Sequence, residues 1–446
     1  MTIHNNFALF SAAILASTLF FAACSDDSSS APEEKSSHEE ETSHEEHHGH
    51  HMDEPSEGDL TLGDEDIQDG FIFLQDTTIN GVLTVSTTTP GATVLKNVKV
   101  TGNLLIKRSG RVDFSGSADV VHVGSSNTDV YAFEDEAQVN GHHFMGKNNT
   151  FTTKSFAEYQ NVDWTEKSVD LATGIHLAYT VTGDEKGTPV VLIHGLTDGR
   201  VSWSQVAPSL AKKGYRVYVP EYRGNGKTDK PIDESSYSVA ELASDIAAFV
   251  EKLGLKKVHI VGHSLGAFIA QELSITNAEI VSSITLIGSG ASVDEKNATL
   301  DWLVNGTDDE SFDGIYAYDS TQKLPESFIQ AWGYSTNPDK DFQAANLEHL
   351  KQVPYYVWKY LVKNLLKIDN TKRLSSIAAD VQIIWGTKDA LFDSESQKTL
   401  QKGLSGAKSV VFHEVEGADH NTHWGSAEDV KTVTGYIDEF IKSLKK

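Results

Sequence analysis

The 446-residue sequence contains a single cysteine, Cys24, and only 37 Lys and Arg residues against 64 Asp and Glu residues. One thiol excludes a disulfide within the chain, a thiolate zinc cluster and an iron–sulfur cluster. The net charge is −27, so the chain lacks the excess of basic residues that binding to nucleic acids requires, and we expect no nucleic-acid partner. Hydrophobic residues nevertheless make up 39% of the chain, which is enough for a sizeable folded core.

Long apolar runs are also scarce, and the clearest one covers residues 7–23 and ends at Cys24. A run of about 17 residues suits the core of a signal peptide better than a membrane span. The stretch Phe21-Ala22-Ala23-Cys24 resembles the lipobox of bacterial lipoproteins. This resemblance implies a signal peptide over residues 1–23, lipidation at Cys24 and a lipid anchor in the cell envelope, at the outer membrane and with surface exposure as one option. An ordinary secretory signal that leads to a secreted protein is the alternative.

Residues 24–59 are dominated by Ser, Glu, Asp and His and contain few apolar residues. Such a segment cannot bury enough apolar surface to offset the loss of chain entropy, which predicts a solvated tether. The segment also contains a histidine cluster, and loose zinc or copper binding is an alternative role for it. The cluster consists of His38, His44, His47, His48, His50 and His51. We favour the charged spacer and predict no defined metal site.

Residues 60–150 consist of short β-branched runs separated by Gly, Asn, Ser and Asp, and similar phrases recur at a spacing of about 20 residues. These phrases start near Asn80, Thr101, Val120 and Asn140. The period predicts a small all-β segment, a β-solenoid with one coil per repeat. A β-sandwich that binds carbohydrate is the alternative, and docking to an envelope or carbohydrate partner stays open alongside a spacer role. We interpret His122, His142 and His143 as strand or turn residues.

Residues 162–446 alternate between apolar strand candidates and helix-length amphipathic runs such as 239–253. This alternation predicts an α/β fold with a mostly parallel, doubly wound sheet, whose functional loops follow the carboxyl ends of its strands. The strand candidates are residues 190–193, 216–219, 258–261, 284–287, 381–385 and 410–415.

One of these loops, Gly262-His263-Ser264-Leu265-Gly266, lies between a strand and a helical run. A tight strand-to-helix turn strains its central residue and exposes the Ser264 hydroxyl, while glycines at both ends avoid crowding. The loop after residues 190–193 can direct the N–H group of Leu196 at a reacting oxygen. Paired with the N–H group of Leu265, it would form an oxyanion hole.

Two further loops supply an acid and a base. Asp389 follows strand 381–385, and His420 follows strand 410–415, which gives the chain order Ser264, Asp389, His420. In such a triad the histidine takes the serine proton, and the aspartate fixes the imidazole tautomer and stabilises the imidazolium. Asp393 and His423 are close competitors for the acid and base roles. We favour Asp389 because it lies directly at the strand end, and we expect His423 to support the base. His263 is expected to pack beneath the pocket.

With the loops at Ser264, Leu196, Asp389 and His420, and with the Tyr222-Arg223-Gly224-Asn225-Gly226 segment, residues 162–446 resemble the αβ-hydrolase superfamily. The resemblance implies the αβ-hydrolase fold with a helical cap at about residues 291–377, and no cofactor or metal. It also implies an acyl-serine mechanism on a small apolar or aromatic ester. A serine at residue 264 opposes the epoxide hydrolase and dehalogenase branches, which alkylate a carboxylate. Other uses of the triad stay open, namely C–C bond hydrolysis, amide or peptide hydrolysis and acyl transfer, as does a non-catalytic binding module.

Overall fold

The computed structural model describes residues 50–51, 56, 58–68, 70–132, 137–147, 149–152, 165–307, 312–318, 324–335, 337 and 339–445. All of them belong to one unit, His48–Lys446. The predicted signal peptide, the predicted lipidation site Cys24 and most of the predicted tether lie outside the described residues. Among the helices of the described part, none combines the length and the apolar character that crossing a membrane requires.

The β-rich segment folds into a sheet in which all named strands of the described part pair in parallel. The recurring phrases of the sequence align in this pairing, because Leu83 pairs with Leu104 and Val121 pairs with both Leu104 and His142. Parallel coils offset by about 20 residues are the pattern of a β-solenoid and not of a sandwich of antiparallel strands. The strands are β1 (His50–His51), β2 (Leu60–Leu62), β3 (Phe71–Gln75), β4 (Thr78–Ile79), β5 (Leu83–Val85), β6 (Ala92–Val100), β7 (Leu104–Ile106), β8 (Gly110–Val123), β9 (Thr128–Tyr131), β10 (Ala137–Phe144) and β11 (Thr150–Thr152).

Apolar residues stack inside this solenoid because every coil places one at the same register. Leu83, Leu104 and Val121 are fully buried in one such column. The outer positions are polar, and His122, His142 and His143 lie on β8 and β10, as predicted for strand residues. The solenoid therefore has its own apolar core.

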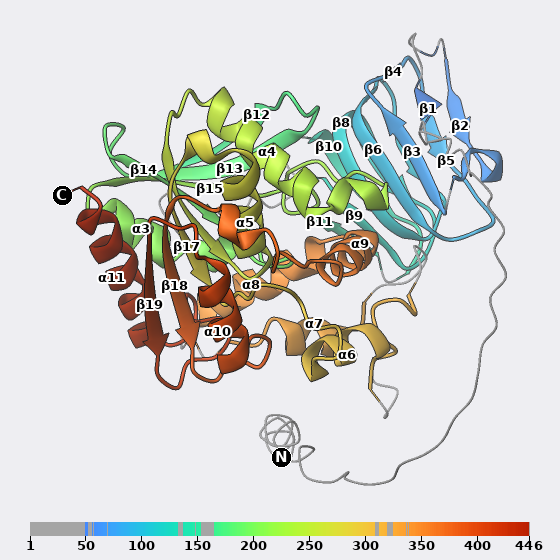
Figure 1. Ribbon diagram of the computed structural model, residues 1–446. Coiled ribbons are helices and arrows are strands. Elements are labelled where there is room, and N and C mark those ends of the chain that lie inside the picture. Colours follow the sequence, from blue (N-terminus) through green and yellow to red (C-terminus); the bar gives the residue numbers. More distant parts are fainter. Residues whose placement is uncertain are drawn as a thin grey trace, which may run out of the picture. The chain divides into compact units, whose positions relative to one another are not determined.

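The second sheet has the strand order β12-β13-β15-β14-β16-β17-β18-β19. From β15 to β19 all pairings are parallel, which confirms the predicted doubly wound sheet (Figure 1). The six predicted strands coincide with the last six in the chain. The strands are β12 (Thr165–Asp170), β13 (His176–Thr182), β14 (Thr188–Ile193), β15 (Tyr215–Pro220), β16 (Val258–His263), β17 (Val281–Ile287), β18 (Asp380–Gly386) and β19 (Ser409–Val415).

The sequence did not reveal β12 and β13, which pair antiparallel with each other and extend the sheet beyond β15. β12 reads Thr-Glu-Lys-Ser-Val-Asp and lies at the edge of the sheet, so it lacks the apolar run by which buried parallel strands are found.

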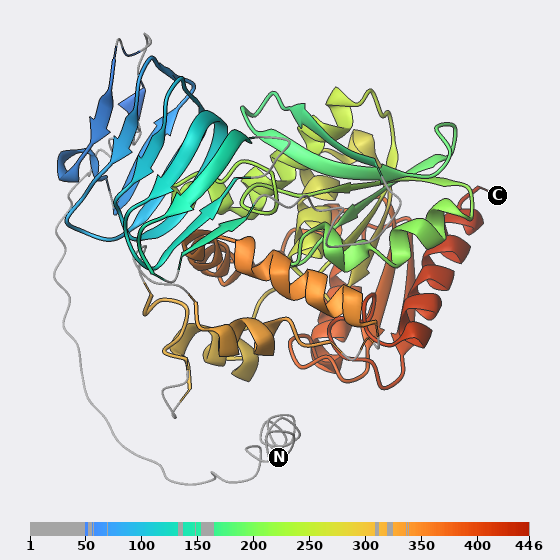
Figure 2. The same ribbon diagram turned by 180° about the vertical axis from the view of Figure 1, so that it is seen from behind.

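The two faces of this sheet bury alternate residues of each strand. On β14, Val190 and Leu192 face α3 (Val206–Ala211) and α11 (Ala427–Ser443), which lie on one side of the sheet (Figure 2). Val191 and Ile193 belong to the other core, with α4 (Val239–Lys252) and α5 (Leu265–Thr276). Helices thus cover both faces, and the loops at the carboxyl ends of the strands are left for chemistry.

In the described residues between β17 and β18, the region predicted as a cap contains four α-helices. They are α6 (Ala298–Asn305), α7 (Glu326–Trp332), α8 (Lys340–Gln352) and α9 (Tyr355–Leu365), and α10 (Ser394–Gly403) follows β18. Their aromatic residues form a stacked core, in which the Phe328 ring lies 4.3 Å from Phe312 and 5.3 Å from Trp358. Short 3-10 turns connect other elements, at Asp64–Asp66, Arg200–Trp203, Glu234–Tyr237, Ala278–Ile280 and Leu374–Ser376.

Candidate active site

Ser264 lies at the sharp turn between β16 and α5 and has a left-handed backbone, with φ of 50°. A non-glycine residue in this region is strained, and only the surrounding structure can hold it there. Its N–H group donates to the carbonyl oxygen of Ile287 at the end of β17 (2.9 Å), and its own carbonyl accepts from Ala267 (2.9 Å). The turn thus anchors Ser264 to the neighbouring strand and to the first turn of α5.

The glycines that flank this turn are required by close backbone contacts. A Cβ atom on Gly262 would lie 2.2 Å from the carbonyl oxygen of Gly266. A Cβ atom on Gly266 would lie 2.3 Å from the carbonyl oxygen of Ile193, at the end of β14. These contacts bring the turn directly against the strand that leads into the loop of Leu196.

His420 and Asp389 form a hydrogen-bonded pair, with 3.0 Å between Nδ1 of the histidine and Oδ2 of the aspartate. Because a carboxylate only accepts, Nδ1 carries the proton and Nε2 keeps its lone pair. The other oxygen of Asp389 accepts the N–H groups of Leu391 and Phe392 (2.8 and 3.0 Å). The carboxylate is buried and held from both sides, so it fixes the imidazole tautomer.

The electrostatics of this pair favour a basic imidazole. Burial disfavours the charged form of His420, but the adjacent Asp389 carboxylate outweighs this effect and raises the pKa of the histidine. Gly288 follows Ile287, which accepts from Ser264, and a Cβ atom on Gly288 would lie 3.0 Å from Nδ1 of His420. The histidine therefore packs against the backbone of the strand end that also anchors Ser264.

The loop after β14 combines strain with a free donor. Thr197 has a left-handed backbone (φ of 62°) although it is β-branched, and its hydroxyl donates to the carbonyl of Leu196 (2.6 Å). Within the described residues, the N–H group of Leu196 has no acceptor. Leu265 is the first residue of α5, where an N–H group has no partner inside the helix. Both predicted donors are thus available to an oxyanion.

A layer of buried rings lies behind these groups, with His263 at its centre. Nε2 of His263 donates to the carbonyl of His420 (3.0 Å), and its Nδ1 lies 3.4 Å from Oδ2 of Asp198. The ring of His423 contacts two other rings at a tilt of 42°, with centroid distances of 4.3 Å to His263 and 4.3 Å to Trp203. Burial lowers the pKa of His423 well below its usual value, so this ring stays neutral and serves as packing.

A buried group of charged residues supports the same loop from below. Glu221 forms an ion pair with Arg200, with 3.0 Å between Oε2 and Nε, and lies 3.9 Å from Nδ1 of His349, which belongs to α8. Burial opposes the charge of Glu221, yet the Arg200 guanidinium keeps the pKa of this carboxyl below its usual value. A second carboxylate, Glu166, contacts Arg200 at 3.1 Å. No local sequence pattern reveals this group, because its members are distant along the chain.

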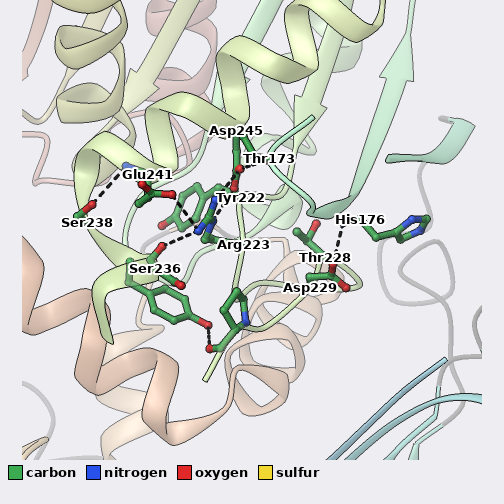
Figure 3. Close-up of polar contacts among 12 residues, drawn as sticks. Thr173, His176, Tyr222, Arg223, Thr228, Asp229, Ser236, Ser238, Glu241 and Asp245 are labelled. Carbon is green, nitrogen blue, oxygen red and sulfur yellow. Dashed lines mark hydrogen bonds and ion pairs between the residues drawn. The ribbon is translucent and has the colours of Figure 1, made fainter. Parts of the chain in front are cut away.

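Arg223 braces a neighbouring loop, as Figure 3 shows. Its guanidinium donates twice to Asp245 (2.7 Å each) and once to the carbonyl of Ser236 (3.1 Å), while Thr173 donates to the same carboxylate (2.6 Å). The two polar ends of the fork are therefore satisfied within the protein, and Arg223 has a structural role. Asp393 caps α10 by accepting from Ser396 (2.8 Å), and the carboxylate that contacts His420 is Asp389.

Of the residues predicted for the site, Asp389 and His420 are in direct contact, Ser264 and Leu265 lie at the turn from β16 to α5, and Leu196 lies in the loop after β14. Cys24 lies outside the described residues. Asp198, Arg200 and His349 were not assigned any role from the sequence. Within the described ranges, no cluster of three or more His, Cys, Asp or Glu side chains is arranged to hold a metal ion.

Comparisons with known proteins agree with this fold. A family model for the alpha/beta hydrolase fold matches residues 188–427, which is more than half of the chain. Epoxide hydrolase 1 of Caenorhabditis elegans is 25% identical over 318 residues, which cover 68% of this chain and 77% of that protein. The 2-hydroxy-6-oxononadienedioate/2-hydroxy-6-oxononatrienedioate hydrolase 1 of Pseudomonas putida is 28% identical over 291 residues, 61% of this chain and 93% of its own.

Solved structures are similar at the level of the fold. A crystal structure of a membrane phospholipase A, described as a bacterial virulence factor, superimposes with a TM-score of 0.54 at 20% identity. The match covers 65% of this chain and 89% of that one.

Proposed function

Because the chain belongs to the alpha/beta hydrolase fold family, we propose that it is a serine hydrolase that cleaves carboxylic esters through an acyl-serine intermediate. The observation that carries this proposal is the strained Ser264 turn beside the hydrogen-bonded His420–Asp389 pair. A hydroxyl is a poor nucleophile at neutral pH unless an adjacent base accepts its proton. His420 has its Nε2 lone pair available for that task, since Nδ1–H donates to Asp389.

The proposed reaction has two halves. The oxygen of Ser264 bonds to the ester carbonyl carbon while its proton passes to Nε2 of His420, and the N–H groups of Leu196 and Leu265 stabilise the oxyanion. Collapse of this intermediate breaks the bond to the alcohol, which leaves with the proton from His420. A water molecule then transfers a proton to His420 and attacks the acyl-serine, which releases the acid and restores the serine.

The names of the relatives are compatible with cleavage of bonds other than esters. The buried charged residues of the hydrolase domain favour a neutral substrate. The name of the Pseudomonas putida relative describes a dicarboxylate substrate, which needs a cationic partner in its site. In the described part of the hydrolase domain, the buried cations Arg200, Arg223 and Lys227 are each paired with a carboxylate. A serine at residue 264 likewise supports an acyl-serine mechanism over the epoxide hydrolysis that the name of the Caenorhabditis elegans relative describes. A neutral ester therefore fits these charges best.

The test is a substrate panel with a matched inactive variant. We expect the protein to hydrolyse p-nitrophenyl esters, with a preference that depends on acyl chain length, and to react covalently with a fluorophosphonate probe. Ser264→Ala should abolish both activities while circular dichroism stays unchanged. Epoxide, amide and C–C bond analogues complete the panel. Turnover of one of these in preference to every ester, or full ester turnover by Ser264→Ala, would refute the proposal.

We also propose that the protein is anchored in the bacterial cell envelope through a lipid at Cys24. The support is the apolar run 7–23 that ends at the only cysteine of the chain. Cys24→Ser should move the protein from the membrane fraction to the soluble fraction, with ester hydrolysis per folded molecule unchanged. Membrane association that persists in this variant would rule out the lipid anchor.

A further inference from the structure

The β-solenoid contacts the hydrolase domain at the carboxyl end of a cap helix. Arg111, on β8, donates to the carbonyl oxygens of Lys351 (3.4 Å) and of Gln352, the last residue of α8. Tyr131, on β9, donates its hydroxyl to the carbonyl of Lys351 (3.1 Å). The last carbonyls of a helix have no partner within it, and a cation at this end is favoured by the helix dipole. Two solenoid side chains therefore cap α8.

These two side chains are held in place before they reach the helix. Asp113, on the same strand, accepts two hydrogen bonds from the Arg111 guanidinium (2.7 and 2.8 Å). The guanidinium also lies over the Tyr131 ring, 4.0 Å from its centroid. Both side chains are mostly buried, with 14% of Arg111 exposed. Because the Arg111 guanidinium is fixed in this way, it can position the carbonyl groups that it binds, which a mobile surface charge could not do.

Two additional contacts strengthen the same junction. The Phe71 ring of β3 meets the Tyr356 ring of α9 edge to face at 4.8 Å. Lys96 of β6 pairs with Asp229 at 2.6 Å. The solenoid thus contacts consecutive cap helices, α8 and α9.

His349 lies one helical turn before the capped end of α8. Its ring packs directly on the backbone of the loop that carries Leu196, since a Cβ atom on Gly199 would lie 2.1 Å from the ring. The ring is buried, and its Nδ1 faces Glu221, which also binds Arg200. A shift of the last turn of α8 would therefore displace His349 against Gly199, three residues from Leu196.

We propose that Arg111 and Tyr131 are positioning residues for the oxyanion loop, so that the solenoid is a working part of the catalytic domain. The solenoid side chains cap the carboxyl end of α8, and this capping sets the position of His349. His349 in turn holds the backbone at Gly199 and with it the N–H group of Leu196. This inference rests on the proposed serine hydrolase function, since it concerns the donor that stabilises the oxyanion.

The test compares Arg111→Ala, Arg111→Lys and Tyr131→Phe in the full chain, with the exposed solenoid residue Lys107→Ala as the control. An oxyanion donor acts in the transition state, so Arg111→Ala should lower kcat by about 10-fold to 100-fold and leave KM nearly unchanged. Arg111→Lys should recover part of kcat, because it keeps the charge but loses the fork. Tyr131→Phe should cost less than Arg111→Ala, and Lys107→Ala should match the wild type.

Fluorophosphonate labelling separates a positioning effect from a loss of folded protein. In Arg111→Ala we expect the final extent of labelling to stay at the wild-type level while its rate falls in parallel with kcat. Wild-type kcat in both Arg111→Ala and Tyr131→Phe, or a loss that follows the labelled fraction alone, would overturn the positioning role. An active Ser264→Ala variant would instead refute the proposed function, so the two failures are distinguishable.

Discussion

The solenoid and the hydrolase domain both contain non-glycine residues with a left-handed backbone, but they use different residue types there. In the solenoid these residues are Asp76, Asn97 and Asn127. Asp and Asn tolerate this conformation because their side chains form local hydrogen bonds. Nδ2 of Asn97, for example, donates to the carboxylate of Asp76 at 2.9 Å. The solenoid thus makes its turns with residues that suit them.

In the hydrolase domain the corresponding residues are Thr197 and Ser264. Neither residue type favours a left-handed backbone, and for a β-branched threonine the cost is highest. Both residues lie in the loops proposed to stabilise an oxyanion and to supply the nucleophile. The difference indicates that the strain in the solenoid serves chain reversal, whereas the strain in the hydrolase domain serves the site.

The two regions also differ in the environment of their histidines. The largest predicted effect on activity concerns one of these histidines, His420. The solenoid histidines His142 and His143 are exposed and His122 is half-buried, whereas His423 is fully buried at the site and the side chain of His420 is 16% exposed. Of His420 and His423, it is His420 that contacts a carboxylate able to stabilise its imidazolium, the buried Asp389. His420→Ala should therefore lower kcat/KM by about 10⁴-fold to 10⁶-fold, as removal of a triad member does.

His423→Ala is the matched variant, three residues away in the same loop. It removes a neutral packing ring, so we expect a loss of about 10-fold to 100-fold, of the size found when a supporting group of a metal site is removed. Both variants should be compared on the best ester, with circular dichroism as the folding control. An inactive His423→Ala beside a mildly affected His420→Ala would reverse the assignment of the base.

The sequence predicted those parts of the fold and site that depend on short stretches of chain. Ser264, Asp389 and His420 each follow an apolar run, and a parallel sheet brings such loops to one edge. The contact between Glu221 and His349 could not be predicted, because it joins a strand end to a cap helix 128 positions further along the chain. The capping of α8 by Arg111 depends on the packing of the solenoid against a helix about 240 positions further along the chain, which no local pattern encodes.

A smaller effect concerns the pH dependence of hydrolysis. Only neutral His420 accepts the serine proton, so kcat/KM should rise with pH through the pKa of this histidine. Burial favours the neutral ring, but Asp389, with smaller contributions from Asp198 and Asp419, raises the pKa above 6.5. The acidic limb should therefore have its midpoint above pH 6.5 in a profile of kcat/KM.

Asp419→Asn sharpens this prediction, because it removes one charge and keeps an oxygen that can accept from the N–H group of Asn421 (2.9 Å). The charge of Asp419 favours the imidazolium, so the midpoint should move to lower pH in the variant, and only slightly because solvent screens an exposed carboxylate. A midpoint that moves to higher pH would contradict the assigned electrostatics.

The smallest predicted changes in stability belong to Thr197→Gly and Asn97→Gly, a pair that tests the comparison of backbone strain directly. Glycine relieves about 1 to 3 kcal/mol of strain at Thr197. The variant also loses a buried methyl group and the hydroxyl hydrogen bond to Leu196, and the added glycine increases the conformational entropy of the unfolded chain. We therefore expect little change in Tm. The loop would become less ordered, so kcat should fall about 10-fold, with KM nearly constant. Asn97 is exposed and its conformation suits asparagine, so Asn97→Gly should leave kcat unchanged and alter stability by about 0.5 kcal/mol at most. Equal effects of the two variants on kcat would mean that strain in the two regions does not differ in purpose.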